Sequence, residues 1–301
     1  MGVVQKGSKR DQDRGKFSSD MKKIKGRKMM KNNTCLWGIF ALTMLFSANS
    51  IASGQRNHDF LEREEINKTF QLSKNARVTG QDEHQTYQLA AGAHVEVSNI
   101  SGPVSVETTD GSSAEVHIYR TAKNSDDLAY RKVFVEQTSS GLTIRQKTGS
   151  SEPSNIDLLN RVVLKLPRQV SVSGKNISAD FNISGVGGAV DLNAISGSVK
   201  AMHLNGALTV SGVSGNVRVA VARINDAGLR VNGISGNVYL GLASDLNAEL
   251  RVGNTTAGVS NKIQGLALVS VGPSNYSARL GSGGPRIEVS GVTGSIVLQR
   301  I

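Results

Sequence analysis

The sequence predicts an all-β fold, a β-solenoid of the parallel β-helix type with an N-terminal cap of β-strands. Three observations support this prediction. A nine-residue pattern repeats five times without a gap between residues 177 and 219, glycine occupies one fixed position of the pattern, and later copies are spaced three residues wider at every second step. Since the chain has 301 residues, it is long enough to bury a core.

The nine-residue pattern reads apolar, any, glycine, any, apolar, any, apolar, any, any. Its apolar-x-apolar piece places two apolar side chains on one face of a short strand. One such strand cannot bury its apolar face alone, so we expect the units to stack. Glycine suits the corner between strands, where φ is often positive or coils approach closely. The third position holds Ala179, Gly188, Gly197, Gly206 and Gly215, and the fifth holds Phe181, Val190, Val199, Leu208 and Val217.

The spacing after Val219 indicates how many units form one coil. The apolar pairs recur at 229/231, 238/240 and 250/252, so the steps are 12, 9 and 12 residues. With two units per coil, both insertions fall at the same corner and the coil grows from 18 to 21 residues. Three units would place the insertions at different corners, so we favour a two-sided, flattened solenoid. The pattern returns at residues 292–298, and only fragments of it occur in 253–286.

Residues 1–52 form a leader with the three parts of a secretory signal peptide. A basic segment at 21–31 precedes an apolar run at 36–46 and small residues at 47–53. The apolar run would cover roughly 16 Å as a helix, whereas a bilayer core is about 30 Å thick. We therefore expect cleavage, with a mature chain that begins between Ile51 and Gly54 and has no transmembrane span. The alternative is an uncleaved N-terminal anchor, and the true start could be Met21, Met29 or Met30.

Charge and cysteine usage narrow the class of protein. The leader contains 11 Lys+Arg and 3 Asp+Glu, so it supplies +8 of the formal net charge of +11. The basic balance is therefore mostly a property of the leader, and we expect no nucleic-acid partner. The single cysteine, Cys35, lies in the leader. A mature chain without cysteine forms no disulfide and has no thiol ligand for a metal, which suits a bacterial envelope protein.

Three segments follow the leader. Residues 53–85 are polar and predict a linker, residues 86–169 predict an N-terminal β-cap of ordinary strands and turns, and residues 170–301 predict the glycine-rich β-solenoid. A cap would cover one open end of the solenoid, an edge that otherwise promotes aggregation.

Three runs within this part of the chain, at residues 92–106, 164–167 and 210–219, resemble a bacterial family of adhesins of unknown function. That family shares repeats with the head-GIN auto-transporter adhesins. The resemblance extends over most of residues 86–301. It implies an exported β-solenoid, and it supplies no catalytic motif.

The search for chemistry predicts no catalytic residue, no metal site and no cofactor. The five histidines, His58, His84, His94, His117 and His203, are scattered without helical or zinc-ligand spacing. A calcium-binding repeat would need an aspartate in every copy, but the sixth positions are Asn182, Asp191, Lys200, Thr209 and Arg218.

The sixth positions do predict a binding surface. With two units per coil, one outer face carries Asn182, Lys200, Arg218 and Tyr239, and the other carries Asp191, Thr209, Arg230 and Arg251. Neighbouring strands lie about 4.8 Å apart, so Lys200 and Arg218 would form a stack of like charges. We predict that Lys200, Arg218 and Tyr239 bind an anionic cell-surface polysaccharide. The alternative is that they only keep a sheet face soluble and hostile to strand pairing.

These observations favour a non-enzymatic exported envelope protein, an adhesin-like binding or structural module in the periplasm or on the cell surface of a bacterium. One alternative is a polysaccharide-acting β-helix enzyme, which would need carboxylates on neighbouring coils, and Asp191 is the only one in the regular sixth positions. The other is an envelope-stress accessory or sensor protein, whose partner would be an envelope protein.

Overall fold

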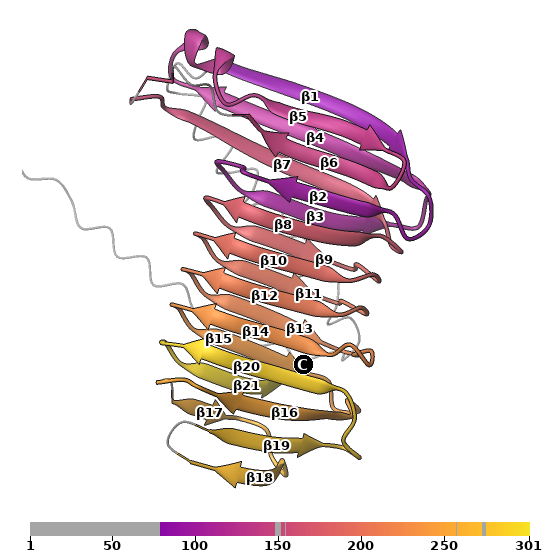
Figure 1. Cartoon of the computed structure of the whole chain (residues 1–301), viewed down its shortest axis with the longest axis vertical. Coiled ribbons are helices and arrows are strands. Elements are labelled where there is room, and N and C mark those ends of the chain that lie inside the picture. Colours follow the sequence, from indigo (N-terminus) through magenta and orange to yellow (C-terminus); the bar gives the residue numbers. More distant parts are fainter. Residues whose placement is uncertain (1–78, 148–151, 154, 257, 273–274) are drawn as a thin grey trace, which may run out of the picture. The chain divides into compact units, whose positions relative to one another are not determined.

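The computed structural model describes residues 79–147, 152–153, 155–256, 258–272 and 275–301. The predictions for the leader and for residues 53–78 lie outside these residues. The described part is all β: its 21 strands form two large mixed sheets, and its one helical turn is of the 3-10 type (Figure 1). None of its helices is long and apolar enough to cross a bilayer.

Sheet A has ten strands, in the spatial order β1 (Thr79–Gln88), β4 (Ser113–Ala122), β7 (Leu158–Pro167), β3 (Val104–Thr109), β9 (Phe181–Ser184), β11 (Val199–Met202), β13 (Val217–Val221), β15 (Val238–Leu242), β21 (Ile296–Arg300) and β17 (Val259–Asn261). Sheet B has eleven strands, in the order β18 (Ala267–Val271), β19 (Tyr276–Leu280), β16 (Ala248–Gly253), β20 (Arg286–Val292), β14 (Leu229–Ile234), β12 (Leu208–Val213), β10 (Val190–Ile195), β8 (Ser171–Ile177), β2 (His94–Ser98), β6 (Gly141–Gln146) and β5 (Val133–Thr138). The 3-10 turn η2 (Ser125–Ala129) follows β4.

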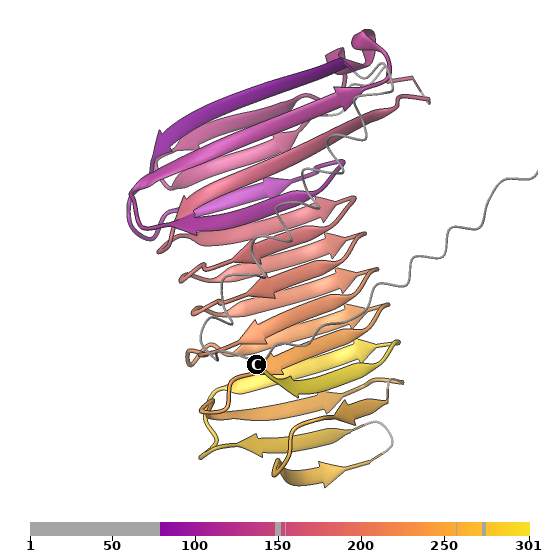
Figure 2. The same ribbon diagram turned by 180° about the vertical axis from the view of Figure 1, so that it is seen from behind.

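From β8 to β15 the chain alternates between the two sheets, and each strand pairs in parallel with the next strand of its own sheet (Figure 1 and Figure 2). Partner residues in β10 and β12 lie 18 residues apart, which is two nine-residue units. The offset between β13 and β15 is 21 residues, because residues 222–228 contain the three-residue insertion. The register thus repeats every two nine-residue units, one strand in each sheet, and we call each such pair of strands a coil.

The apolar-x-apolar residues fill the space between the sheets. In β13, Val217 and Val219 are buried, whereas Arg218 between them is exposed. Val199 and Val238, which pair with Val217, are buried as well. Burial of each such side chain stabilises the folded state by about 1.5–3 kcal/mol relative to leaving it exposed to water. The strand pattern therefore supplies both the local conformation and the core.

The third-position glycines are required by close approach between coils. A β-carbon on Gly206 would lie 2.0 Å from the carbonyl oxygen of Gly188 in the preceding coil, and Gly206 does not have a positive φ. Left-handed residues occupy the ninth position instead, for example Ala194 with φ 54° and Gly212 with φ 63°. Of the two reasons expected for glycine at this position, close approach between coils is confirmed, whereas the third position does not supply the positive φ.

A ladder of side chains joins the coils at the fourth position. The side-chain oxygen of Asp180 accepts a hydrogen bond from the backbone N–H of Ser198, and Ser198 Oγ accepts one from Asn216. Asn216 and Asn237 continue the ladder by accepting the backbone N–H groups of Asn237 and Ser295. In this way, backbone N–H groups at the corners, which have no partner in a neighbouring strand, receive a side-chain acceptor.

The C-terminal strands are not stacked in chain order. The spacing predicts that Leu250 and Val252 follow directly upon Leu229 and Val231, but β20 lies between β14 and β16, and β21 lies between β15 and β17. The chain forms β16 and β17, continues through β18 and β19, whose pairings are antiparallel, and then returns to fill the vacant coil. The nine-residue spacing gives no sign that the chain returns in this way, so the strand order predicted from the sequence is wrong for these strands.

The N-terminal strands belong to the same two sheets. The first strand within the described residues begins at Thr79, inside the segment 53–85 that the sequence assigns to a linker. Of the strands in segment 86–169, β2 and β3 pair in parallel with β8 and β9, so they form the coil that precedes the regular repeats. The strands β1, β4 and β5 add antiparallel pairs beyond it.

A buried arginine organises the interior of this N-terminal part. Arg120 is 2% exposed and donates hydrogen bonds to the side chains of Asn160 and Gln81 and to the carbonyl oxygens of Leu128 and Tyr130. Its burial lowers the pKa of the guanidinium. Four acceptors compensate the loss of water around the cation, and they connect β1, β4 and β7 with the residues around η2.

Candidate functional site

The three residues predicted to bind a ligand lie next to one another on the outer face of sheet A. Lys200 in β11 pairs with Arg218 in β13, and Arg218 pairs with Tyr239 in β15. Each has buried residues before and after it in its strand, so its side chain points away from the core. We call these three residues the basic strip. The register brings them together, and their role in binding stays a prediction.

Arg218 and Tyr239 make a specific contact within the basic strip. The Cζ atom of Arg218 lies 5.0 Å from the centroid of the Tyr239 ring, which is a cation–π arrangement. Such a contact at an exposed site is worth about 0.5–1 kcal/mol. Because the ring supports the guanidinium, Arg218 has less conformational freedom to lose when an anion binds.

The strands around the basic strip contain no acidic residue. The strands β9, β11, β13, β15 and β21 contain Lys200, Arg218 and Arg300 but neither Asp nor Glu. Arg300 lies at the exposed end of β21 in register with the buried Leu242, so it is not on the outer face, and its Nη1 donates a 2.6 Å hydrogen bond to the carbonyl oxygen of Ala243. Exposed charges of one sign on one face attract a partner of the opposite sign. This part of sheet A therefore favours an anionic partner.

The outer face of sheet B has a mixed charge. The sequence predicts a column of Asp191, Thr209, Arg230 and Arg251, and the first three do pair in register. Arg251, however, is separated from Arg230 by Glu288 of β20, because β20 occupies the coil between them. Arg230 Nη2 lies 3.3 Å from the Glu288 carboxylate. The predicted neighbourhood of Arg230 and Arg251 is thus wrong, and the face is balanced instead of basic.

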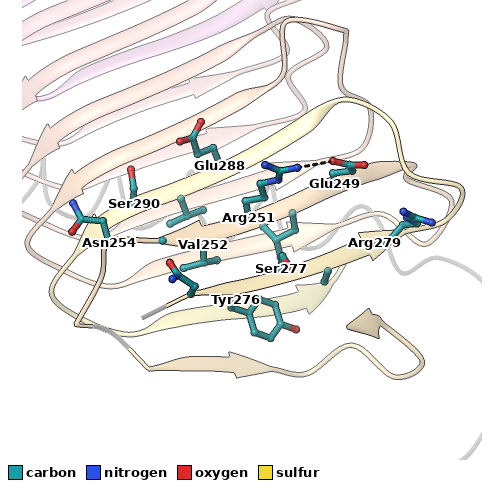
Figure 3. Close-up of a pocket in the computed structure, with 14 residues that line it drawn as sticks. Glu249, Arg251, Val252, Asn254, Tyr276, Ser277, Arg279, Glu288 and Ser290 are labelled. Carbon is teal, nitrogen blue, oxygen red and sulfur yellow. Dashed lines mark ion pairs between the residues drawn. The ribbon is translucent and has the colours of Figure 1, made fainter. Parts of the chain in front are cut away.

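A groove of about 570 Å³ opens on sheet B, lined by residues of β16, β19 and β20 (Figure 3). Figure 3 shows Arg251, Glu288 and Ser290 on one side of the sheet and Tyr276 on the other, where Tyr276 pairs with the buried Val252. Arg251 Nη2 lies 3.5 Å from the Glu249 carboxylate. The lining of the groove contains four charged residues, the arginines Arg251 and Arg279 and the glutamates Glu249 and Glu288. The sequence did not reveal it, because it exists only through the return of β20.

A second cluster that the sequence did not reveal lies on the outer face of β1 and β4. His84 and His117 are directly opposite each other in the antiparallel pair, and Glu115 is two residues before His117. Their ligand atoms all lie within 4.8 Å of one another. Glu115 and His117 could have been placed on one face from the period of two along a strand. The contribution of His84 depends on the pairing of β1 with β4, which no local pattern indicates.

No family model matches the sequence, and no curated protein matches it. Among solved structures, a "putative cell adhesion protein" from Clostridium sporogenes is similar over 74% of this chain and 100% of its own, with 11% identity and a TM-score of 0.43. A "putative adhesin" from Bacteroides fragilis is similar over 72% of this chain and 97% of its own, with 12% identity and a TM-score of 0.37. A "putative lipid binding protein" from Parabacteroides distasonis is similar over 73% of this chain and 97% of its own, with 9% identity and a TM-score of 0.21. At these identities and TM-scores the likeness assigns neither a ligand nor an activity to this chain.

Proposed function

We propose that this chain is a non-enzymatic, exported protein of the bacterial envelope, an adhesin-like binding module whose basic strip binds an anionic cell-surface polysaccharide. The observation that supports this proposal most is the outer face of sheet A, where Lys200, Arg218 and Tyr239 lie in register on three neighbouring strands whose sequences contain neither Asp nor Glu. Export rests on the signal-peptide pattern of the leader.

The scaffold of the module is a two-sided β-solenoid in this proposal. Its support is the regular offset of 18 residues between parallel partners, which grows to 21 where three residues are inserted. Stacked units of this kind offer extended surfaces on which one side-chain position recurs from coil to coil. A repeating polymer can contact such a surface at several equivalent points.

The chemistry of the basic strip suits an acidic glycan. Lys200 and Arg218 supply charged donors for carboxylate or sulfate groups, and the guanidinium can form two parallel hydrogen bonds. Tyr239 supplies an aromatic body with a polar hydroxyl group, a combination common at binding surfaces. The three side chains lie in register on neighbouring strands, so they can engage a chain that passes across the strands.

The groove on sheet B supports binding more than cleavage. A glycoside hydrolase uses two carboxyl groups, one as an acid and one as a base or nucleophile. Glu249 and Glu288 in the groove each lie in an ion pair, with Arg251 and Arg230 respectively. Carboxylates held by arginines on an open sheet face suit the positioning of a polar ligand.

Replacing Lys200 and Arg218 together by glutamate should strongly reduce retention on an alginate column relative to wild type, and wild-type retention should decrease as salt is added, because exposed charges are screened. The matched control is Lys175→Glu with Arg230→Glu, which makes the same change in net charge on the outer face of sheet B. Loss of the Arg230–Glu288 pair costs little, since exposed ion pairs contribute about 0–1 kcal/mol. All variants keep the leader, so its charges contribute equally.

Equal retention of wild type and the Lys200/Arg218 variant, with unchanged melting curves, would contradict the proposal. Equal loss of retention in both double variants would also contradict it, because net charge alone would then explain binding.

A further inference from the structure

We propose that His84, His117 and Glu115 form a binding site for a divalent transition metal ion, of which zinc is the best match, and that the ion ties β1 to β4. The three residues lie on the outer face of sheet A. The proposal is independent of the function proposed for the basic strip.

The positions of the three side chains support this site. His84 and His117 are opposite residues of the antiparallel pair, and their rings are stacked with centroids 3.9 Å apart and planes 18° apart. The His117 Nε2 atom lies 3.6 Å from the Glu115 carboxylate. Zinc binds nitrogen and oxygen at about 2.0–2.2 Å, so ligand atoms about 4 Å apart or less can share one ion. The ligand atoms lie within 4.8 Å of one another, and binding of one ion would require the two stacked rings to turn so that their nitrogen lone pairs converge.

The donor set selects the class of metal. Two imidazoles and one carboxylate suit zinc, copper or nickel, whereas calcium and magnesium prefer sites made entirely of oxygen. Three protein ligands leave the fourth position of a zinc ion for water. Because the His84 side chain is exposed on an open sheet face, water can reach that position.

The Glu115 carboxylate already has a cationic partner. The Nζ atom of Lys165 donates a hydrogen bond of 3.3 Å to the Glu115 carboxylate. The lysine competes with the ion for the same oxygen, so removing the lysine should strengthen metal binding.

A metal at this place would act on an edge of sheet A. Among the strands that the structure describes, β1 is the last of sheet A and pairs with β4 alone, and its outward residues are exposed. Edge strands with unpaired backbone groups can pair with other chains. An ion held by His84 on β1 and by two residues of β4 fixes the edge strand in its register.

Titration of the untagged full chain with zinc chloride in a calorimeter tests the site. We expect wild type to show a binding event that His117→Ala and His84→Ala each weaken at least about tenfold, since even residues that only support a metal ligand contribute 10–100-fold. Lys165→Ala should bind zinc more tightly than wild type. His203→Asn is the matched control: it removes another imidazole at a residue with φ 53°, a conformation that asparagine tolerates, and should bind like wild type.

Thermal unfolding separates metal binding from folding. Without zinc all four variants should melt like wild type, and with zinc the melting temperature should rise for wild type and for His203→Asn but not for His84→Ala or His117→Ala. Zinc binding that persists unchanged when both His84 and His117 are alanine would overturn the proposal, because the ion would then be held elsewhere, for example in the leader.

Discussion

Gly206→Ala should lower the free energy of unfolding by about 3 kcal/mol or more, because an added β-carbon would lie 2.0 Å from the carbonyl oxygen of Gly188. That atom belongs to the backbone of the preceding coil, so it can move only if the stacking of the two coils changes. The neighbouring carbon of Gly188 would be 2.5 Å away, which leaves no direction for a small adjustment. Chemical denaturation of the two purified proteins measures the difference.

Gly212→Ala is the matched control for this substitution. Gly212 lies in the left-handed region, but a β-carbon there meets nothing closer than 3.4 Å, and the equivalent residue of the preceding coil is already an alanine, Ala194. We expect a cost of about 1–2 kcal/mol, from backbone strain alone. If the two variants were equally stable, coil-to-coil contact would not be the reason for the third-position glycine.

Val217→Asp should also destabilise the protein by about 3 kcal/mol or more. The Val217 side chain is fully buried between the two sheets, with the buried Val199 and Val238 as neighbours in register. A carboxylate there would lose its hydration and find no evident cationic partner. The midpoint of thermal unfolding should fall accordingly.

Arg218→Asp tests the same change one residue further along the strand. Its side chain points outward, so the cost should be about 1 kcal/mol or less, most of it from the lost contact with Tyr239. Similar melting temperatures for Val217→Asp and Arg218→Asp would contradict the assignment of inward and outward faces.

Local pattern was sufficient to predict the regular part of the fold. The alternation in β13 places Val217 inside and Arg218 outside, and the spacing of the copies gives the offsets of 18 and 21 residues. Both depend only on residues a few positions apart, because a strand has a period of two and each coil repeats the last. The place of Lys200, Arg218 and Tyr239 on neighbouring strands follows from the same regularity.

The local sequence pattern could not predict which strands pair when they are distant in the sequence. The stretch at 292–298 shows the repeat, but nothing in it indicates that β20 inserts between β14 and β16. That insertion places Glu288 beside Arg230 and creates the groove on sheet B. The pairing of β1 with β4, which brings His84 to His117, likewise joins residues that are distant in the sequence. Such pairings depend on the energy of the whole sheet and not on one segment.

The reason for glycine at the third position could not be predicted from the sequence either. The sequence marks the position but does not distinguish a conformational need from a steric one, since glycine serves both. The structure separates them: Gly206 has no room for a β-carbon, whereas the positive φ occurs three residues earlier at His203 and again at Gly212. Only the position of the preceding coil decides between these causes.

Chemical labelling of lysines with and without alginate tests most directly whether the outer face of sheet A is the binding face. Lys200 in β11 and Lys175 in β8 lie on the outer faces of sheet A and sheet B, and both can be acetylated and quantified by mass spectrometry in one sample. If the basic strip binds the polysaccharide, alginate should slow the acetylation of Lys200 severalfold and leave that of Lys175 unchanged, and added salt should remove the protection. Equal protection of both lysines, or protection of Lys175 alone, would contradict this role of the basic strip.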